Sequence, residues 1–557
     1  MGRRRDTIVA RAARGAAAGC AALAVTVVMT WPLAAGIGRL GRTVPGDGLH
    51  SIWNVAWVAR TIVADPIHLF DANIFYPHRD TLAYSESNLG AGVLSAPVWW
   101  LTKNAYATHN WALLLGFATC ALATWLLARH LCGDGLAAAP AAVLFAFAPY
   151  FFSHTPHIQL LMAGGIPLSM LMLHRLADAP TPRAGVVLGI ALGVQALSCA
   201  YYGIFAGLMV GYAAIFLAVS RRRWTREYWI AIAIAATIAV LCVVPFFVPY
   251  LEMQREQGFR RTLDDSFRYS ANIASYLTSS AHAHDWLLDV VRRSRLERWR
   301  EVLFPGLMVT VFGIGGFILA VRGARAAGRA RETAWLYASL GAIAFWASFG
   351  PSAVLYELLF RALPLFSFLR APARFGMIVA FALAVLSSFA IVELFRHVRP
   401  RLRPMLTVAL TGFAMLELNL LPFPWDRALP IPQPYYVLAR LPRGPVAEFP
   451  FYGGRVVYHL HTQYMVYSTA HWQHLLNGYS DHFPPDFREA AVVLDGFPSD
   501  DGFAVLRRAR VRYVTVNWDM FGPRRDEIRR RLKPYEAYLR PLAEDATMTL
   551  FEVVGFP

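Results

Sequence analysis

The sequence predicts a polytopic all-α membrane protein of about 11 transmembrane helices, with a small exported α/β domain at its C-terminal end. Three observations lead to this fold class. The 557-residue chain is 56% hydrophobic and has a mean hydropathy of +0.40. Only 16% of its residues are charged, whereas a soluble chain contains about 25%. Long apolar runs separated by arginine-rich segments continue to about residue 421, and residues 422–557 contain none.

Each apolar run is long enough, or nearly long enough, to cross a bilayer as a helix, which takes about 20 residues. The runs are 16–38, 110–128, 136–152, 158–173, 184–200, 201–220, 228–250, 302–321, 334–349, 375–395 and 405–421. We interpret the first run as an uncleaved helix rather than a signal peptide, because no charge interrupts it from Ala16 to Gly38. The run from Leu89 to Thr102 is too short to span and is interpreted as a re-entrant or interfacial helix.

The arginines of the short connections lie in alternate positions along the chain. They precede the first apolar run and recur at 221–226, 322–331 and 396–403. Because positively charged short loops stay in the cytoplasm, this alternation predicts a cytoplasmic N-terminus. It also predicts a transmembrane domain over 1–421 and an extracytoplasmic domain over 422–557. The outer loops would then be 39–109, 251–301 and 350–374.

The tail has the pattern of a small α/β domain. Strand-like runs lie at 445–451, 511–517 and 548–554, and helical patterns lie around 487–496 and 526–539. The tail is also rich in histidines and aromatic residues between Glu448 and His482. These residues suit either a sugar-binding surface or a surface against the membrane portion, and their spacing matches no zinc-ligand set.

The first outer loop is long for a connection and is crowded with ionisable and aromatic groups. Such a loop on a helical scaffold predicts a binding or reaction site. Its earliest acid is Asp47, in the stretch "VPGDGLHSIWN" between Gly46 and Gly48. Two interpretations stay open for Asp47, a reacting group or the N-cap of a helix that starts at Leu49.

The order of these segments resembles the GT-C superfamily of integral-membrane glycosyltransferases. The resemblance is carried by "FDANIFYPHRDTLAYSE", "SHTPHIQLL", "FLRAPARFG" and "MVYSTAHWQHLLNGYS". These stretches are similar to an uncharacterised bacterial branch, distantly similar to protein O-mannosyltransferases and the lipid A aminoarabinose transferase. The superfamily also includes the oligosaccharyltransferases. The likeness covers nearly the whole chain and gives no information about the sugar.

The resemblance implies a GT-C-like transmembrane domain in the bacterial inner (cytoplasmic) membrane. It implies that a sugar moves from a polyprenyl-phosphate-linked donor to an extracytoplasmic acceptor, which is a glycan, a lipid or a protein. The expected partners are therefore this donor, the acceptor and membrane lipids, with no nucleic acid. The charge pattern agrees, because the net charge of +17 is explained by membrane topology.

The resemblance also implies roles for residues of the first outer loop. In the superfamily this loop supplies an aspartate that acts as general base or holds a metal, and Asp47 matches it by position. Gly48 stands where many members have a second acid, so a partner carboxylate is sought elsewhere. We expect Glu86 as the second catalytic candidate, with Asp80 and the Asp264–Asp265 pair as alternatives. No metal ligands are predicted, no cofactor is certain, and the use of a divalent cation stays open.

Arginines near the predicted outer face are candidates for binding the lipid phosphate of the donor, because the guanidinium group binds phosphate bidentately. "FLRAPARFG" places Arg370 and Arg374 at the mouth of the 375–395 run, and "GFRRTLDDSFRYS" adds Arg261. The alternative is that such arginines extend to lipid headgroups.

His154, His157 and Gln159 follow the 136–152 run and are candidates for hydrogen bonds to the substrate, or else interfacial turn residues. Glu417 near the end of the last run is either a functional acid or a solvated interface acid. Two alternatives to a glycosyltransferase remain. One is a flippase or transporter of lipid-linked saccharide, although no internal repeat typical of transporters is found. The other is a non-catalytic envelope assembly protein.

Overall fold

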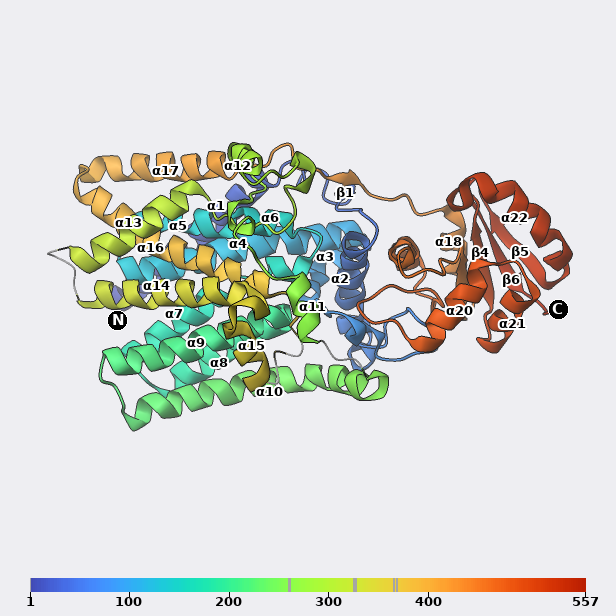
Figure 1. Ribbon diagram of the computed structural model, residues 1–557, viewed down its shortest axis with the longest axis horizontal. Coiled ribbons are helices and arrows are strands. Elements are labelled where there is room, and N and C mark those ends of the chain that lie inside the picture. The colour runs from blue at the N-terminus through green and yellow to red at the C-terminus, as the bar shows by residue number, and fades with distance from the viewer. Residues whose placement is uncertain (1, 259–261, 324–327, 364–365, 367–368) are drawn as a thin grey trace. The chain divides into compact units, whose positions relative to one another are not determined.

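The computed structural model describes residues 2–258, 262–323, 328–363, 366 and 369–557 (Figure 1). The chain divides into two compact units. The first unit comprises Met1–Ala35, Leu113–Phe246 and Arg260–Phe423. The second unit comprises Gly36–Ala112, Phe247–Phe259 and Pro424–Pro557, and it therefore joins the first predicted outer loop to the tail. Helices α4 (Ala105–Cys132) and α10 (Arg226–Gln257) contribute residues to both units.

The first unit is a bundle of helices (Figure 1). Its remaining helices are α1 Gly2–Met29, α5 Gly135–Ala146, α6 Pro149–Ser153, α7 Gly165–Asp178, α8 Pro182–Ser198, α9 Ala200–Ser220, α11 Leu263–Arg268, α12 Asp285–Val290, α13 Leu307–Arg322, α14 Gly328–Ser348, α15 Leu355–Ala362, α16 Gly376–Arg396 and α17 Arg403–Glu417. Every predicted apolar run coincides with one or more of the helices, which confirms the mostly helical fold class. In the first run the helix ends earlier than expected, because α1 ends at Met29 and not near residue 38.

Among the described residues, six helical segments are long and apolar enough to cross a membrane by length and composition. They are Ala105–Cys132, Gly135–Ser153, Ile158–Asp178, Ala200–Ser220, Arg226–Arg255 and Pro372–Arg396. Shorter apolar helices include Gly15–Met29, Leu89–Thr102, Pro182–Ser198 and Leu307–Arg322. The chain is thus a multi-pass membrane protein in which several predicted spans are shorter than the ideal length.

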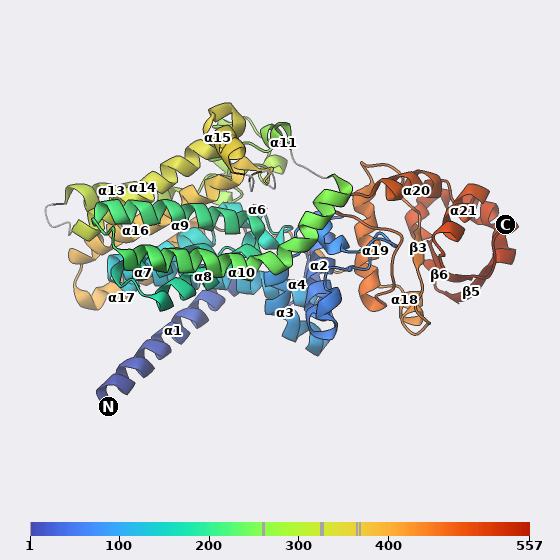
Figure 2. The ribbon, with the colours of Figure 1, turned by 90° about the horizontal axis from the view of Figure 1, so that it is seen from below.

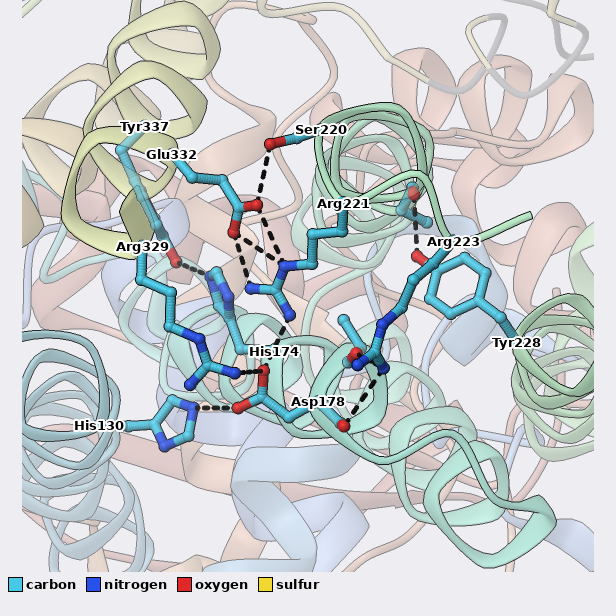
Figure 3. Close-up of polar contacts among 12 residues, drawn as sticks. His130, His174, Asp178, Ser220, Arg221, Arg223, Tyr228, Arg329, Glu332 and Tyr337 are labelled. Carbon is cyan, nitrogen blue, oxygen red and sulfur yellow. Dashed lines mark hydrogen bonds and ion pairs between the residues drawn. The ribbon is translucent and has the colours of Figure 1, made fainter. Parts of the chain in front are cut away.

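Ends of helices that the arginine pattern assigns to the same side of the membrane lie together in the first unit. Figure 3 shows one such group, in which Asp178 at the end of α7 accepts hydrogen bonds from Arg221 at 2.8 Å and Arg329 at 2.9 Å. Glu332 on α14 accepts from Arg221 at 2.7 Å. All of these ends are predicted to be cytoplasmic. The structure therefore agrees with the predicted alternation of the spans, and which end faces the cytoplasm stays a prediction.

Glu417 lies in a second group at the ends of helices that are predicted to be on the outer side. Its carboxylate accepts hydrogen bonds from the backbone amides of Leu307 and Met308, the first residues of α13, and contacts His284 Nε2 at 3.0 Å. Glu417 is only 8% exposed. Its carboxylate thus satisfies amides that the start of a helix leaves unpaired. The interpretation of Glu417 as a solvated interface acid is wrong, because the side chain caps α13 in the interior.

The second unit contains a four-stranded sheet with the order β3-β4-β6-β5. Strands β3 and β4 are parallel, and the β4–β6 and β6–β5 pairs are antiparallel. The three predicted strands are confirmed as β3, β4 and β6, whereas β5 was not predicted. β5 contains Pro541 and an irregularity between Pro541 and Ala543, which an edge strand tolerates. The elements of the unit are β1 Leu40–Gly41, α2 Asp47–Ala64, α3 Leu89–Thr102, β2 Asp426–Arg427, α18 Gln433–Leu438, β3 Val446–Phe449, α19 Thr462–Tyr467, α20 Pro485–Asp495, α21 Asp500–Arg508, β4 Tyr513–Asn517, α22 Arg525–Leu532, β5 Leu539–Glu544 and β6 Met548–Val553.

The first outer loop is bound to the tail by backbone hydrogen bonds. The amides of Phe75 and Tyr76 donate to the carbonyls of Asn477 and Leu475 at 3.1 and 2.9 Å, and the Leu475 amide donates to Asn73 at 2.9 Å. β1 from the loop also pairs with β2 from the tail. Helix α2 packs against both α3 and α19 (Figure 2). The loop and the sheet thus form one folded body.

Candidate functional site

Helix α2 begins at Asp47, and the backbone conformation of the residue before it favours a glycine. Gly46 has φ 99°, a left-handed value that favours glycine. The Gly46 amide donates to Thr462 Oγ1 at 3.0 Å. Gly46 occupies the capping position, so the interpretation of Asp47 as the N-cap is wrong. Asp47 is exposed in the first turn of α2, where the helix dipole favours a negative charge.

Gly48 is required for a different reason. A Cβ atom at this position would lie 2.2 Å from the carbonyl oxygen of Arg42. The backbone of the preceding turn therefore occupies the space of any side chain at residue 48. This packing explains why the sequence lacks a second acid next to Asp47. Adjacent paired carboxylates do not fit here.

Aromatic side chains from two distant segments surround the start of α2. His50, one turn after Asp47, lies 5.7 Å from the Trp53 ring and 5.9 Å from the Tyr479 ring, measured between ring centroids. The Tyr479 hydroxyl also lies 3.7 Å from the place of a Cβ at Gly46. His50 and Tyr479 were not predicted as site residues. Both segments are visibly rich in histidine and aromatic residues, but nothing local in the sequence pairs them.

Glu86 lies beside a later part of helix α2 than the turn that carries Asp47. Its main-chain carbonyl accepts a hydrogen bond from Asn54 Nδ2 at 3.1 Å. Asn54 follows Asp47 by seven residues, which is about 10 Å along a helix. The next amide, that of Ser87, donates to the Tyr250 hydroxyl at 3.0 Å. Glu86 itself is half-buried.

In the first unit, Arg374 lies among tyrosines. Its guanidinium carbon is 4.1 Å from the centroid of the Tyr201 ring at the start of α9. Arg374 is half-buried and, among the described residues, forms no ion pair with a carboxylate. A positive charge in this setting is stabilised by the ring but is not neutralised. An anion would complete the site.

The segment "FLRAPARFG" is held in place by aromatic packing. The Phe375 ring lies 4.2 Å from that of Phe205. The Arg370 amide donates to the Tyr201 hydroxyl at 2.6 Å, and the Arg370 guanidinium lies 5.3 Å from the Tyr269 ring. One tyrosine, Tyr201, therefore contacts both predicted phosphate-binding arginines, Arg370 through its hydroxyl and Arg374 through its ring.

His154 belongs to the same neighbourhood. Its ring lies 4.3 Å from that of Tyr150, tilted by 33°, and its Nδ1 lies 2.7 Å from the Tyr150 carbonyl oxygen. Burial, with contributions from His157 and Arg374, lowers the pKa of His154 to about 3. The imidazole is therefore neutral at physiological pH and adds no charge beside Arg374.

His157 and Gln159 follow His154 in the chain and are described by their own contacts. The His157 ring lies 6.1 Å from that of His154, and its amide donates to the His154 carbonyl at 2.8 Å. Gln159 is half-buried in a single 3-10 turn, Ile158–Leu161. Arg261 lies outside the described residues. Within the described ranges, no group of three or more His, Cys, Asp or Glu side chains is placed to hold a metal ion.

Two histidines and one acid of the tail are interior residues, whereas His474 and Asp481 are exposed. His461, His471 and Glu448 are buried, and Glu448 hydrogen-bonds with Tyr435 at 2.6 Å and with Thr515. Burial raises the pKa of Glu448 to about 7 and lowers the pKa of His461 to about 3. His461, His471 and Glu448 therefore belong to the core of the tail, and the role of the exposed residues of this segment stays a prediction.

Comparison with known proteins identifies the family. The model of the family described as "Domain of unknown function (DUF6311)" matches residues 60–413. No curated protein matches the sequence. Similar solved structures include the apo oligosaccharyltransferase of Archaeoglobus fulgidus, at 13% identity and TM-score 0.47, over 95% of this chain and 73% of that one. Apo ArnT from Cupriavidus metallidurans is similar at 14% identity and TM-score 0.39, over 98% of each chain. The family model covers more than half of the chain, and the protein is therefore a member of the DUF6311 family.

Proposed function

We propose that this protein is a membrane glycosyltransferase that moves a sugar from a polyprenyl-phosphate-linked donor to an extracytoplasmic acceptor. The observation that carries the proposal is Arg374, a half-buried guanidinium with no ion-paired carboxylate among the described residues. It is supported by the resemblance of "FLRAPARFG" and "SHTPHIQLL" to GT-C sequences.

The proposed role of Arg374 is to bind the phosphate of the lipid carrier. Transfer of the sugar leaves negative charge on this phosphate, and a fixed cation stabilises the charge as it develops. The contact with the Tyr201 ring, 4.1 Å from the guanidinium carbon, helps to position the guanidinium. His154 is neutral, and its Nδ1–H donates to the Tyr150 carbonyl, so it adds no charge beside the proposed phosphate site. Arg370 is placed by Tyr201 to assist.

The proposed role of Asp47 is that of the general base that removes the proton of the acceptor. Its carboxylate is exposed at the first turn of α2, and His50 and Tyr479 lie beside this turn. A base must be within hydrogen-bond reach of the acceptor hydroxyl, and an exposed carboxylate can meet an external substrate. Because Gly48 excludes an adjacent acid, we propose a single base with no obligatory metal, and Glu86 as a secondary acid on the same side of α2.

The test is complementation of a deletion strain, with mass spectrometry of lipid-linked sugars and envelope glycoconjugates. The wild-type gene should restore the glycoconjugate that the deletion removes. Asp47→Asn and Arg374→Ala should restore an amount of this glycoconjugate that is lower by a factor of about 100 or more. This is the loss that follows removal of a charge-stabilising donor from an active site. Both variants should keep normal membrane levels of the protein.

Two matched controls share the chemistry of these variants. Asp65→Asn removes an exposed carboxylate that pairs with His68 in the same loop. Arg268→Ala removes an exposed arginine that also lies over a tyrosine ring, Tyr269. Both should complement fully. Full complementation by Asp47→Asn would exclude the proposed base, and transfer that EDTA abolishes would show that a divalent cation is needed.

A further inference from the structure

Helix α3 has an exposed apolar face in the second unit. No charged residue occurs from Leu89 to Thr102. One side of the helix, with Ala91, Gly92, Ser95 and Ala96, is buried. The other side exposes large apolar side chains at helical spacing, which are Val93 at 51%, Leu94 at 42%, Trp100 at 42% and Leu101 at 85%. A helix that is apolar all round requires an apolar environment on both sides.

The apolar face continues onto the turn after α2. Ile67 is 88% exposed and Val63 is 60% exposed. The Trp100 indole nitrogen donates to the carbonyl of Ala59, which fixes the end of α3 beside the end of α2. A Cβ at Gly92 would lie 2.3 Å from Val58 Cγ1, so the two helices pack with no side chain between them at this point. We call the exposed side chains of Val93, Leu94, Trp100, Leu101, Val63 and Ile67 the α3 face.

Three cations lie beside a group of three tryptophans next to this face, of which Trp99 and Trp472 are buried and Trp100 is exposed. The Lys103 Nζ atom is 3.6 Å from the Trp100 ring centre, and the Arg60 guanidinium is 5.2 Å from that of Trp472. Trp472 packs edge-on against Trp99 at 5.5 Å, and the Arg443 guanidinium donates to the Trp472 carbonyl at 3.1 Å. Burial and the nearby Arg443 lower the pKa of Arg60. The carboxylate of Asp65 opposes this effect but also pairs with His68. An anion bound beside Lys103, Arg60 and Arg443 would be stabilised by their positive charges.

The connection from α3 to α4 indicates which surroundings would cover the face. Only Lys103 and Asn104 separate α3 from α4, which starts at Ala105 and is one of the helices able to cross a membrane. The Asn104 side chain accepts from the Ala107 amide and so caps the spanning helix. Helix α4 has 28 residues and is about 42 Å long, against a core of about 30 Å, so its start and the adjoining end of α3 would lie within about 12 Å of the membrane boundary. A helix of 14 residues is about 21 Å long, which is too short to span a core of about 30 Å.

We propose that the α3 face is embedded in the interfacial region of a phospholipid bilayer, with Lys103, Arg60 and Arg443 binding lipid phosphates. Tryptophan and lysine at the ends of an apolar segment are the side chains that favour this zone. Interfacial helices bury their apolar face about 5–10 Å into the headgroup and acyl boundary. The proposal thus takes the interfacial rather than the re-entrant interpretation of this helix.

The inference does not rest on the proposed enzymatic function. It concerns a docking surface that would hold α2, and with it Asp47, at the membrane surface. Because Gly92 joins α3 tightly to α2, the depth of α3 sets the height of the whole helix that carries Asp47.

The test measures the depth of spin labels in proteoliposomes of phosphatidylcholine and phosphatidylglycerol. Single cysteines at Leu94 and Leu101 are introduced into the full chain after replacement of Cys20, Cys120, Cys132, Cys199 and Cys242. Labels at Leu94 and Leu101 should collide with oxygen, be shielded from a water-soluble nickel complex, and lie at similar depths of about 5–10 Å below the phosphates. The matched control is Val456, which is 88% exposed in the tail, and its label should be open to the nickel complex.

Two outcomes would overturn the proposal. Labels at Leu94 and Leu101 that are as accessible to nickel as the label at Val456 would show that the face meets water. A Leu94 label much deeper than the Leu101 label would show a re-entrant helix. Should the cysteine-free chain fail to fold, Trp100→Phe in the wild-type background provides a second measurement. Because the chain has 16 tryptophans, this variant should lose a part of the fluorescence quenching by lipids brominated near the headgroup, and unchanged quenching would contradict the proposal.

Discussion

The carbonyl oxygen of Arg42 occupies the space in which a side chain at Gly48 would begin, 2.2 Å from the place of the Cβ atom. Backbone cannot move aside as the end of a flexible side chain can. We therefore expect Gly48→Ala to destabilise the second unit by about 1–3 kcal/mol, as overpacking does in well-packed interiors. Gly48→Asp should destabilise it at least as much and should not create a second catalytic acid. Thermal unfolding of the purified protein measures the change.

Gly454→Ala is the matched control for this prediction. A Cβ at Gly454 would meet only a Val457 side-chain atom at 3.6 Å, which is an ordinary contact. This variant should unfold at the wild-type temperature. Equal stability of Gly48→Ala and Gly454→Ala would contradict the packing argument for the absence of an acid at residue 48.

A second prediction separates the two contacts of Tyr201. Tyr201→Phe keeps the ring beneath Arg374 and removes only the hydroxyl that accepts from the Arg370 amide. Tyr201→Leu removes both. Because a cation–π contact contributes about 0.5–2 kcal/mol, the leucine variant should lose an additional 2- to 30-fold of transfer activity relative to the phenylalanine variant. The rate of sugar transfer from the lipid-linked donor measures this difference, and equal rates would show that the ring does not position Arg374.

The parts of the fold that the sequence predicts are those whose signal is local. Each apolar run became a helix because about 20 consecutive residues carry the information. Strands β3, β4 and β6 were visible as alternating β-branched and aromatic residues. β5 was missed because Pro541 argues against a strand, and only its position at the sheet edge makes it acceptable.

The parts that were not predicted depend on residues far apart in the chain. Asn73 hydrogen-bonds with Gln473 and Ser468, about 400 residues away, and no spacing rule reports such a pair. The same holds for the site. The residue type and position of Arg374 indicated a phosphate-binding group, but its partner Tyr201 carried no signal of its own. In the tail, residue type alone does not separate the buried His461 and His471 from the exposed His474.

A third prediction concerns the ion pairs in Figure 3. Arg221 bridges Asp178 and Glu332, and its side chain is 15% exposed and that of Glu332 is 9% exposed. Removing one partner of a buried ion pair leaves the other charge uncompensated, which costs about 3–5 kcal/mol. Arg221→Met should therefore unfold at a lower temperature than wild type. Arg222→Met, at an exposed neighbouring position, should have no effect, and similar losses in both variants would contradict the specific role of Arg221.

The fourth prediction follows from Glu448 in the core of the tail. Burial raises the pKa of Glu448 from an ordinary 4.5 to about 7, although hydrogen bonds from Thr515 and Tyr435 oppose the change. The folded state therefore holds a proton that the unfolded state releases between these two values. Stability from this group is complete below pH 4.5, falls as the pH rises, and is fully lost above about pH 7. The shift corresponds to about 3 kcal/mol.

Glu448→Gln keeps the shape and the acceptor oxygen but cannot ionise. Its stability relative to wild type should therefore rise by about 3 kcal/mol between pH 4.5 and pH 7.5. The comparison with wild type is necessary because His461 and His471, whose pKa values burial lowers to about 3, favour stability at higher pH in both proteins. Scanning calorimetry of the full chain in detergent measures the difference. Glu544→Gln, an exposed change in the same sheet, should give a constant difference over this range. A constant difference for Glu448→Gln as well would show that folding does not raise the pKa of Glu448.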